Sequence, residues 1–174
     1  AGLAAETAAM RRRHRPAPAW RHPYVMWCAG AVLCLWAAYG LAGARGVAVY
    51  VALAGYAQAQ LLMADYVQHY GLRRRRRPDG RWEPGGMQHS WNARPWYSSA
   101  MMLNAPRHSD HHAHPARPYP ALRLRRDEAP MLPYSLPAMA TLALVPKLWQ
   151  RVMGRELRRW HASHPRPAPT APGT

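Results

Sequence analysis

Three histidines stand close together in the chain, His108, His111 and His112. Residues at i, i+3 and i+4 lie on one side of an α-helix, so one helical turn would present all three imidazoles in the same direction. Neutral imidazole is the commonest protein ligand for a metal near neutral pH, and it suits iron, zinc, copper and nickel. The spacing therefore predicts a metal site. A solvated basic turn is the alternative interpretation.

His69 is a fourth candidate ligand, because it closes an apolar segment at the point where the chain becomes polar. Asp65 lies one turn earlier on the same helix face, where it could accept the ring N–H of His69 and fix its tautomer. On spacing alone, two interpretations of His69 stay open. It reaches a metal site at the membrane interface, or its side chain turns to the lipid headgroups.

The remaining polar candidates are weaker. Asp110 points away from the three neighbouring histidines on a helical wheel, so we expect it to orient a ligand or to hold an arginine. His89 is isolated in a predicted loop, a setting more typical of a structural histidine, and His114 is followed by Pro115, which disfavours helical geometry. Four other histidines lie among arginine and proline or in the C-terminal tail and are predicted to be solvated: His14, His22, His161 and His164.

Two uncharged runs precede this region, Tyr24–Ala44 and Gly46–Ala64, with Arg45 between them. Each is about as long as a helix needs to cross a hydrocarbon core of ~30 Å. Small side chains in the second run allow close helix–helix contact. We therefore expect an all-α integral membrane protein with a transmembrane helical hairpin that turns near Arg45. Two buried helices of a large soluble protein are the alternative.

Basic residues lie on both sides of the hairpin, at 11–15 and in Arg73–Arg77, and short loops rich in lysine and arginine stay cytoplasmic. Prolines interrupt the later apolar stretch, which favours an interfacial or re-entrant segment. The predicted organisation is a cytoplasmic basic segment at 1–23, the hairpin at 24–64, a cytoplasmic histidine-box region at 65–128, an interfacial or re-entrant apolar segment with a basic helix at 129–160, and a disordered tail at 161–174.

The amino-acid composition limits the classes of partner that the protein could bind. Lysine and arginine number 24 against 8 acidic residues, a net charge of +16, which is typical of proteins that bind nucleic acid or anionic membranes. The long apolar runs favour membrane lipid and exclude a soluble nucleic-acid binder. Cys28 and Cys34 have no CxxC spacing, so they support neither a zinc site nor an iron–sulfur site.

Several short motifs occur together after the hairpin: QHYG at 68–71, HSWN at 89–92, RHSDHHAHP at 107–115, DEAPMLP at 127–133 and LVPKLWQRVM at 144–153. Through them the segment from Asp65 to Arg158 resembles the C-terminal part of the membrane-bound alkane 1-monooxygenases. These are histidine-box di-iron membrane enzymes of the superfamily that includes the fatty acid desaturases and hydroxylases.

The resemblance implies that His69, His108, His111 and His112 bind iron, as part of the ligand set of two non-haem iron ions. It implies that His89 lies near the site without binding iron. The family usually has Asn where His114 stands, and often Asn and Glu where Asp65 and Gln68 stand. Asp65, Asp110 and His89 are thus expected beside the ligands. The family's two earlier histidine boxes are absent, so we expect the C-terminal portion of a longer enzyme, inactive alone.

For the complete enzyme, the resemblance implies hydroxylation of the terminal methyl group of n-alkanes with O2. Electrons would come from rubredoxin, which an NAD(P)H-dependent reductase supplies, and the basic face is a candidate docking surface. The enzyme would be a multi-pass protein of the bacterial inner membrane with its metal site facing the cytoplasm. Two alternatives stay open: a xylene-type or fatty-acid hydroxylase or desaturase of the same superfamily, and a non-enzymatic polybasic protein that binds anionic lipid.

Overall fold

The computed structural model describes residues 2–12, 20, 22–77, 79–125 and 127–164, and within them it is helical, without a β-strand. His14 and residues 165–174 of the predicted tail lie outside the described residues. The all-α prediction is confirmed for the described part. The elements are α1 (Gly2–Arg12), α2 (Pro23–His69), η2 (Met87–His89), α3 (Trp96–Met101), α4 (His108–Ala113), η3 (Tyr119–Ala121), α5 (Leu136–Ala143) and α6 (Pro146–Ser163).

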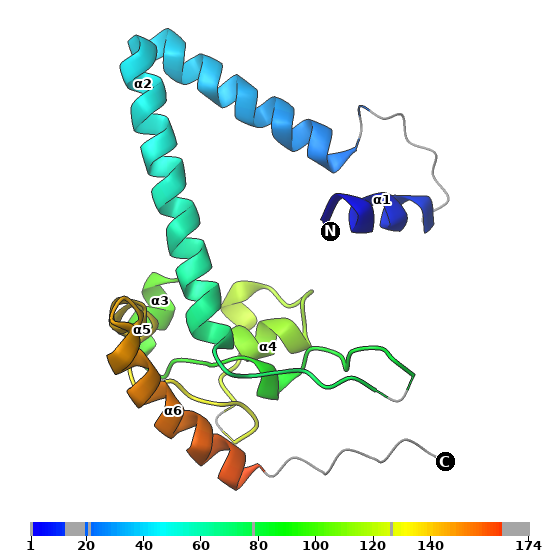
Figure 1. The fold of residues 1–174 in the computed structure, drawn as a ribbon, viewed down its shortest axis with the longest axis vertical. Helices are drawn as coiled ribbons and strands as arrows, with labels where there is room; N and C mark the ends of the chain where they lie inside the picture. The colour runs from blue at the N-terminus through cyan, green and yellow to red at the C-terminus, as the bar shows by residue number, and fades with distance from the viewer. Residues whose placement is uncertain (1, 13–19, 21, 78, 126, 165–174) are drawn as a thin grey trace. The chain divides into compact units, whose positions relative to one another are not determined.

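The chain divides into two compact units, Ala1–Gln58 and Ala59–Thr174. In the first unit, helical geometry in α2 breaks at Ala42 and Gly43. Gly43 has φ 58° and ψ −146°, a region that is open to glycine and strained for other residues. A Cβ on Gly46 would collide with the carbonyl oxygen of Ala38, so the chain is tightly packed at this bend (Figure 1). The break thus falls just before Arg45, at the glycine that can adopt it.

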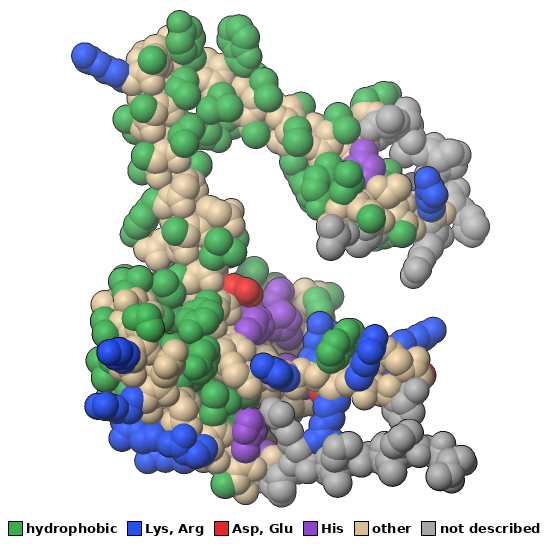
Figure 2. All heavy atoms as spheres, in the orientation of Figure 1, with side chains coloured by type: hydrophobic (Ala, Val, Ile, Leu, Met, Phe, Trp, Pro, Cys, Tyr) green, Lys and Arg blue, Asp and Glu red, His purple; other side chains and the backbone are tan. Residues whose placement is uncertain are grey.

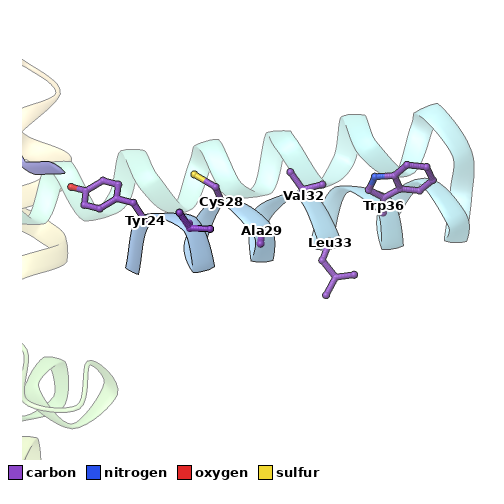
Figure 3. A pocket seen from close by; sticks show the side chains of 7 residues that line it. Tyr24, Cys28, Ala29, Val32, Leu33 and Trp36 are labelled. Carbon is purple, nitrogen blue, oxygen red and sulfur yellow. The ribbon is translucent and has the colours of Figure 1, made fainter. Parts of the chain in front are cut away.

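Within the described residues, α2 is the one helix long and apolar enough to cross a membrane. Its apolar side chains are open to the surroundings: Leu33 is 69% exposed, Trp36 71% and Leu41 88%. Soluble proteins rarely leave a contiguous apolar surface of this kind uncovered. In the part of α2 that precedes the break at Ala42–Gly43, one face carries an open groove of about 680 Å³ (Figure 3). Tyr24, Cys28, Val32 and other apolar side chains line it.

The second unit is built around the C-terminal end of α2. Its core brings together residues from α2, the loops and the last two helices: Val67, Trp91, Ala93, Leu132, Leu136, Met139, Trp149 and Met153. The Trp149 ring packs against Tyr66 and Tyr70, with centroid distances of 5.7 and 5.2 Å. Such aromatic contacts add to the area that the rings bury. The core therefore anchors the segment that carries His69.

Helix α6 has two contrasting faces. Trp149 and Met153 on one face are fully buried in the core, whereas Lys147, Arg151 and Arg155 on the other are exposed. Lysine and arginine side chains accordingly gather along α6 in Figure 2. The face of α6 that carries Trp149 and Met153 is thus covered by protein, and its basic face is open to other partners. The interfacial or re-entrant placement of the segment 129–160 stays a prediction.

Candidate metal centre

His69 is the last residue of α2, and the chain turns sharply after it. Gly71 has φ 71°, which favours glycine, and the Leu72 N–H donates to the carbonyl oxygen of His69 at 3.2 Å. A Cβ on Gly71 would collide with the Leu157 side chain of α6. The turn therefore ends α2 at His69 and holds that end against the core.

Helix α4 is short, with six residues from His108 to Ala113. Its hydrogen bonds include His114 N–H to the carbonyl oxygen of Asp110 at 2.9 Å. This single turn places His108 and His112 one above the other, as their i, i+4 spacing predicts.

The imidazoles of His69, His108 and His112 converge through their Nε2 atoms. Nε2 of His108 lies 3.2 Å from that of His69 and 2.9 Å from that of His112, and the potential ligand atoms of all three lie within 4.8 Å of one another. A neutral imidazole has one donor and one acceptor nitrogen, so His108 Nε2 cannot satisfy both neighbours at once. Three converging lone pairs instead fit a metal ion. Figure 2 shows histidine side chains gathered here beside an acidic one.

The environment favours the neutral form of His108 and His112. Burial, followed by repulsion from His112, His69 and His111, lowers the pKa of His108 from 6.5 to about 3. Burial also lowers the pKa of His112, as do His69, His111 and Arg74, against an opposing effect of Asp65. A neutral histidine is the form that binds a metal. His108 is therefore ready to bind a metal ion over the whole physiological pH range.

A buried polar network fixes the start of α4. The Asn92 side chain accepts from the Ser109 N–H at 3.0 Å and donates to the Ser109 hydroxyl oxygen at 3.0 Å. The Ser109 hydroxyl in turn donates to the carbonyl oxygen of Ser90 at 2.6 Å. All three residues are at most 1% exposed. Ser109 follows His108 directly, so this network fixes the backbone that carries His108.

The same loop also forms hydrogen bonds with the C-terminal end of α2. The Trp91 N–H donates to the carbonyl oxygen of Gln68 at 2.7 Å, and its indole N–H donates to that of Tyr70 at 2.8 Å. Gln68 and Tyr70 flank His69, just as Ser109 flanks His108. The Gln68 side chain adds a bond to the carbonyl oxygen of Ala105 at 3.1 Å. The HSWN segment at 89–92 therefore sets the separation between His69 and α4.

Asp110 is fully buried and turned to the loop that follows α4. Its carboxylate accepts from Arg117 Nη1 at 2.6 Å to each oxygen, from the Arg123 N–H at 2.8 Å, and lies 3.2 Å from His114 Nδ1. Burial alone would raise the pKa of Asp110, but the bonds from Arg123 and Arg117 lower it overall. Of the two roles predicted for Asp110, the geometry matches the holding of an arginine.

His89 lies beside the cluster with both ring nitrogens engaged. Nδ1 accepts from the Gly86 N–H at 3.0 Å, so Nε2 carries the proton that meets Glu83 at 2.8 Å. Burial raises the pKa of Glu83, but hydrogen bonds from the Arg75 N–H and from His89 lower it overall. Together with His69 and His112, His89 lines a cavity of about 310 Å³. This agrees with a residue near the metal that does not bind it.

His111 stands apart from the three converging histidines. Its ring stacks on Tyr119 at 5.4 Å and lies 6.3 Å from the ring of His108. Its Nδ1 is buried and has no hydrogen-bond partner among the described residues. An unsatisfied buried polar atom costs about 1–3 kcal/mol, so a ligand for this nitrogen would be stabilising.

Asp65 contacts the cluster from α2. Its Oδ1 lies 3.6 Å from Nε2 of His69, the nitrogen that also faces His108. An aspartate that fixes the tautomer of a ligand histidine contacts the nitrogen turned away from the metal. The carboxylate of Asp65 is instead on the cluster side of the ring.

Ser90, Asn92, Ser109 and Glu83 stand in no pattern along the sequence that predicts their contacts. Their contacts join residues six to nineteen positions apart, and no periodicity links them. Among the histidines predicted to be solvated, His22 lies 3.2 Å from the Thr7 hydroxyl oxygen. The HSWN motif, a run of hydrogen-bonding side chains in a predicted loop, was the sequence feature that pointed to the network of Ser90, Asn92 and Ser109.

A family model described as fatty acid desaturase matches residues 2–143. The chain belongs to the fatty acid desaturase family. The match includes all three histidines of the cluster and ends before α6. In this member of the fatty acid desaturase family, the helix that supplies Trp149 and Met153 to the core thus lies beyond the matched residues.

The chain is similar to alkane 1-monooxygenase 1 of Pseudomonas aeruginosa, with 35% identity over 158 residues, which are 90% of this chain and 41% of the relative. It is 37% identical to alkane 1-monooxygenase 2 of the same species over the same shares. Alkane 1-monooxygenase of Acinetobacter baylyi is 42% identical over 93 residues, 53% of this chain and 22% of that protein. The predicted resemblance is confirmed, and the chain spans 41% of the first relatives' length.

Proposed function

We propose that this chain is the C-terminal portion of a membrane-bound non-haem di-iron monooxygenase that hydroxylates the terminal methyl group of n-alkanes. The observation that carries the proposal is the convergence of three imidazole nitrogens, from His69, His108 and His112. Membership of the fatty acid desaturase family and the similarity to alkane 1-monooxygenases support iron as the metal.

A second iron ion needs further ligands. His111 is the fourth proposed iron ligand, because its buried Nδ1 lacks a partner among the described residues. The chain matches 41% of the length of its first relatives, so the proposal assigns the missing ligands to the rest of a longer protein. The three converging histidines would then hold one ion and His111 would contribute to the other.

The residues of this chain have distinct parts in the proposed reaction. When bound, iron supplies the reductive activation of O2 that inserts one oxygen atom into the substrate and releases the other as water. Burial of His108 lowers its pKa and keeps its imidazole unprotonated. Asn92 and Asp110 fix α4 on either side of the ligands, and the Glu83 carboxylate holds the proton of His89 Nε2 at the cavity wall.

The apolar surface of α2 supports a membrane location and an apolar substrate. We propose that the two arms of α2, separated at Ala42–Gly43, form a transmembrane hairpin. Its basic flanks would keep the histidine cluster on the cytoplasmic side of the bacterial inner membrane. The groove at Tyr24–Trp36 is lined by apolar side chains, which suits contact with lipid or with an alkane dissolved in the bilayer.

The metal assignment is tested by loading the purified 174-residue chain with Fe(II) in detergent and measuring bound iron. We expect His108→Ala and His112→Ala to abolish binding at micromolar iron. His164→Ala is the matched control, because His164 is exposed and stacks on Trp160 away from the cluster. Unchanged iron binding in His108→Ala would favour the non-enzymatic, lipid-binding interpretation instead.

The substrate is tested in the complete protein with n-octane, xylene and a fatty acid as competing substrates. Terminal octanol as the main product is expected. The description of the matching family, fatty acid desaturase, gives a lipid acyl chain as the second candidate. A hydroxylated or desaturated fatty acid as the main product would favour that candidate and reject the alkane.

The electron donor is proposed to be rubredoxin, reduced by an NAD(P)H-dependent reductase. Arg73, Arg74, Arg76 and Arg77 are exposed, and Arg74 lines the cavity beside His69. Complementary charge speeds the association of such partners in a salt-dependent way. Arg73→Gln with Arg74→Gln should slow rubredoxin-dependent turnover, whereas Arg151→Gln with Arg155→Gln on α6 should leave it unchanged. Equal effects of both pairs would reject this docking surface.

A further inference from the structure

The position of Asp65 relative to the histidine cluster is specific. Asp65 precedes His69 by one helical turn, and its Oδ1 lies 3.6 Å from His69 Nε2. That nitrogen is the one directed at His108, at 3.2 Å. Asp65 Oδ1 therefore lies near the ring nitrogen of His69 that is directed at His108.

The separations match those between ligands of one metal ion. Nitrogen and oxygen ligands lie roughly 2.0–2.2 Å from a first-row metal, so two neighbouring ligands are about 2.8–3.6 Å apart in octahedral or tetrahedral arrangements. Nε2 of His108 lies 2.9 Å from that of His112 and 3.2 Å from that of His69, and Asp65 Oδ1 lies 3.6 Å from His69 Nε2. The ligand atoms within 4.8 Å of one another come from the three histidines, so a rotamer change would bring the Asp65 carboxylate into this group. The Asp65 side chain is 69% exposed, so it has room to adjust its rotamer toward an ion.

The chemistry of a carboxylate suits this place. Three neutral histidines leave the full charge of a divalent ion uncompensated, in a chain of net charge +16. An anionic oxygen would offset part of this charge. Carboxylates combine with histidines in non-haem iron(II) sites that keep open positions. The amide of an asparagine, which the resemblance leads one to expect at this position, supplies no such charge.

We propose that Asp65 is an oxygen ligand of the metal ion held by His69, His108 and His112. The inference rests on the proposed metal site. It gives that one ion three nitrogen ligands and one oxygen ligand from four side chains of this chain.

Cobalt(II) is a suitable probe, because its visible absorption reports the number and type of ligands. The 174-residue chain in detergent is titrated with Co(II) at 0.1 M and 0.5 M NaCl, alongside Asp65→Asn, Asp65→Glu, Asp127→Asn and His108→Ala. Asp127 is the matched control, since it is an exposed aspartate and its change removes the same charge. Far-ultraviolet circular dichroism verifies that each variant is as helical as the parent chain.

We expect Asp65→Asn to weaken Co(II) binding about tenfold or more and to shift the visible bands at both salt concentrations. Asp65→Glu should retain most of the affinity, and Asp127→Asn should match the parent chain. Unchanged affinity and bands in Asp65→Asn would overturn the ligand assignment. A loss that disappears at 0.5 M NaCl with unchanged bands would also overturn it, because screening removes only a long-range charge effect.

His108→Ala separates the two proposals. Loss of Co(II) binding in His108→Ala together with no change in Asp65→Asn would reject Asp65 as a ligand and keep the histidine site. Unchanged binding in His108→Ala would reject the metal site itself.

Discussion

At the scale of single residues, His108 shows how burial and like neighbours prepare a ligand. Its pKa of about 3 means that the folded chain excludes a proton that the unfolded chain accepts near pH 6.5. The burial that lowers this pKa therefore makes folding depend on pH. Asp110 is a contrasting case, because its burial is compensated by hydrogen bonds to Arg117 and Arg123.

The pH dependence of the metal-free chain follows from this difference. Between pH 6.5 and about 3, the unfolded state binds more protons at His108 than the folded state, so stability is fully present above pH 6.5 and falls as the pH decreases. The slope for one proton is about 1.4 kcal/mol per pH unit at most. Denaturant unfolding in detergent at pH 7, 6 and 5 measures it. His108→Asn should flatten the curve, and an equally steep curve in that variant would contradict the assignment.

At the scale of elements, the loop that contains the HSWN segment at 89–92 determines where the ends of α2 and α4 meet. The HSWN segment contacts both neighbours of His69 through Trp91 and the neighbour of His108 through Asn92. Neither helix approaches the other through an extended apolar face. The separation of the ligands therefore depends on buried hydrogen bonds, which have narrower geometry than apolar contacts.

Replacement of Asn92 by alanine should uncouple this connection. The Ser109 N–H would be left buried without a partner, at a cost of about 1–3 kcal/mol in the free energy of unfolding. Metal affinity should fall about 10- to 100-fold, as for other residues that position ligands. Asn92→Asp keeps the acceptor for the Ser109 N–H and should recover part of the affinity. Equal metal affinity in the alanine variant would show that Asn92 serves stability alone.

Replacement of Gly71 by alanine tests the turn after His69. The positive φ of 71° and the adjacent Leu157 side chain both oppose a Cβ, so we expect a loss of about 1–3 kcal/mol in stability. Gly85→Ala is the control, because a Cβ there would meet nothing within 4 Å. If thermal unfolding of the two variants coincided, the close contact between this turn and α6 would not contribute to stability.

At the scale of the whole molecule, a helical membrane-type segment and a metal-binding segment occur in one chain. The apolar side chains of α2 are exposed, and the core of the second unit is closed by α5 and α6. A lipid bilayer would cover the exposed apolar side chains of α2. The core of the second unit, which α5 and α6 already cover, would not need it.

Cys28 and Cys34 can test whether α2 lies in the membrane, because both lie on this helix and are exposed in the protein alone. In sealed membrane vesicles we expect a charged, membrane-impermeant maleimide to leave both unmodified, and denaturing detergent to make both reactive. An Asp127→Cys variant supplies a water-exposed control. Rapid labelling of Cys28 and Cys34 in intact membranes would contradict a transmembrane α2.

The sequence by itself determined the helical class, the apolar character of α2, the family and the position of His108 one helical turn before His112. These depend on local composition and on spacing along one helix, which are properties of neighbouring residues. The break in α2 was expected near Arg45 and lies at Ala42–Gly43, where the backbone adopts a conformation suited to glycine. Only the tertiary structure decided that His111 stands apart, that Asp65 lies on the cluster side of His69, and that Ser90, Asn92 and Ser109 connect the ligands. These features depend on which loops fold against each other, and the hydrogen bonds between residues distant in the chain have no periodic signal.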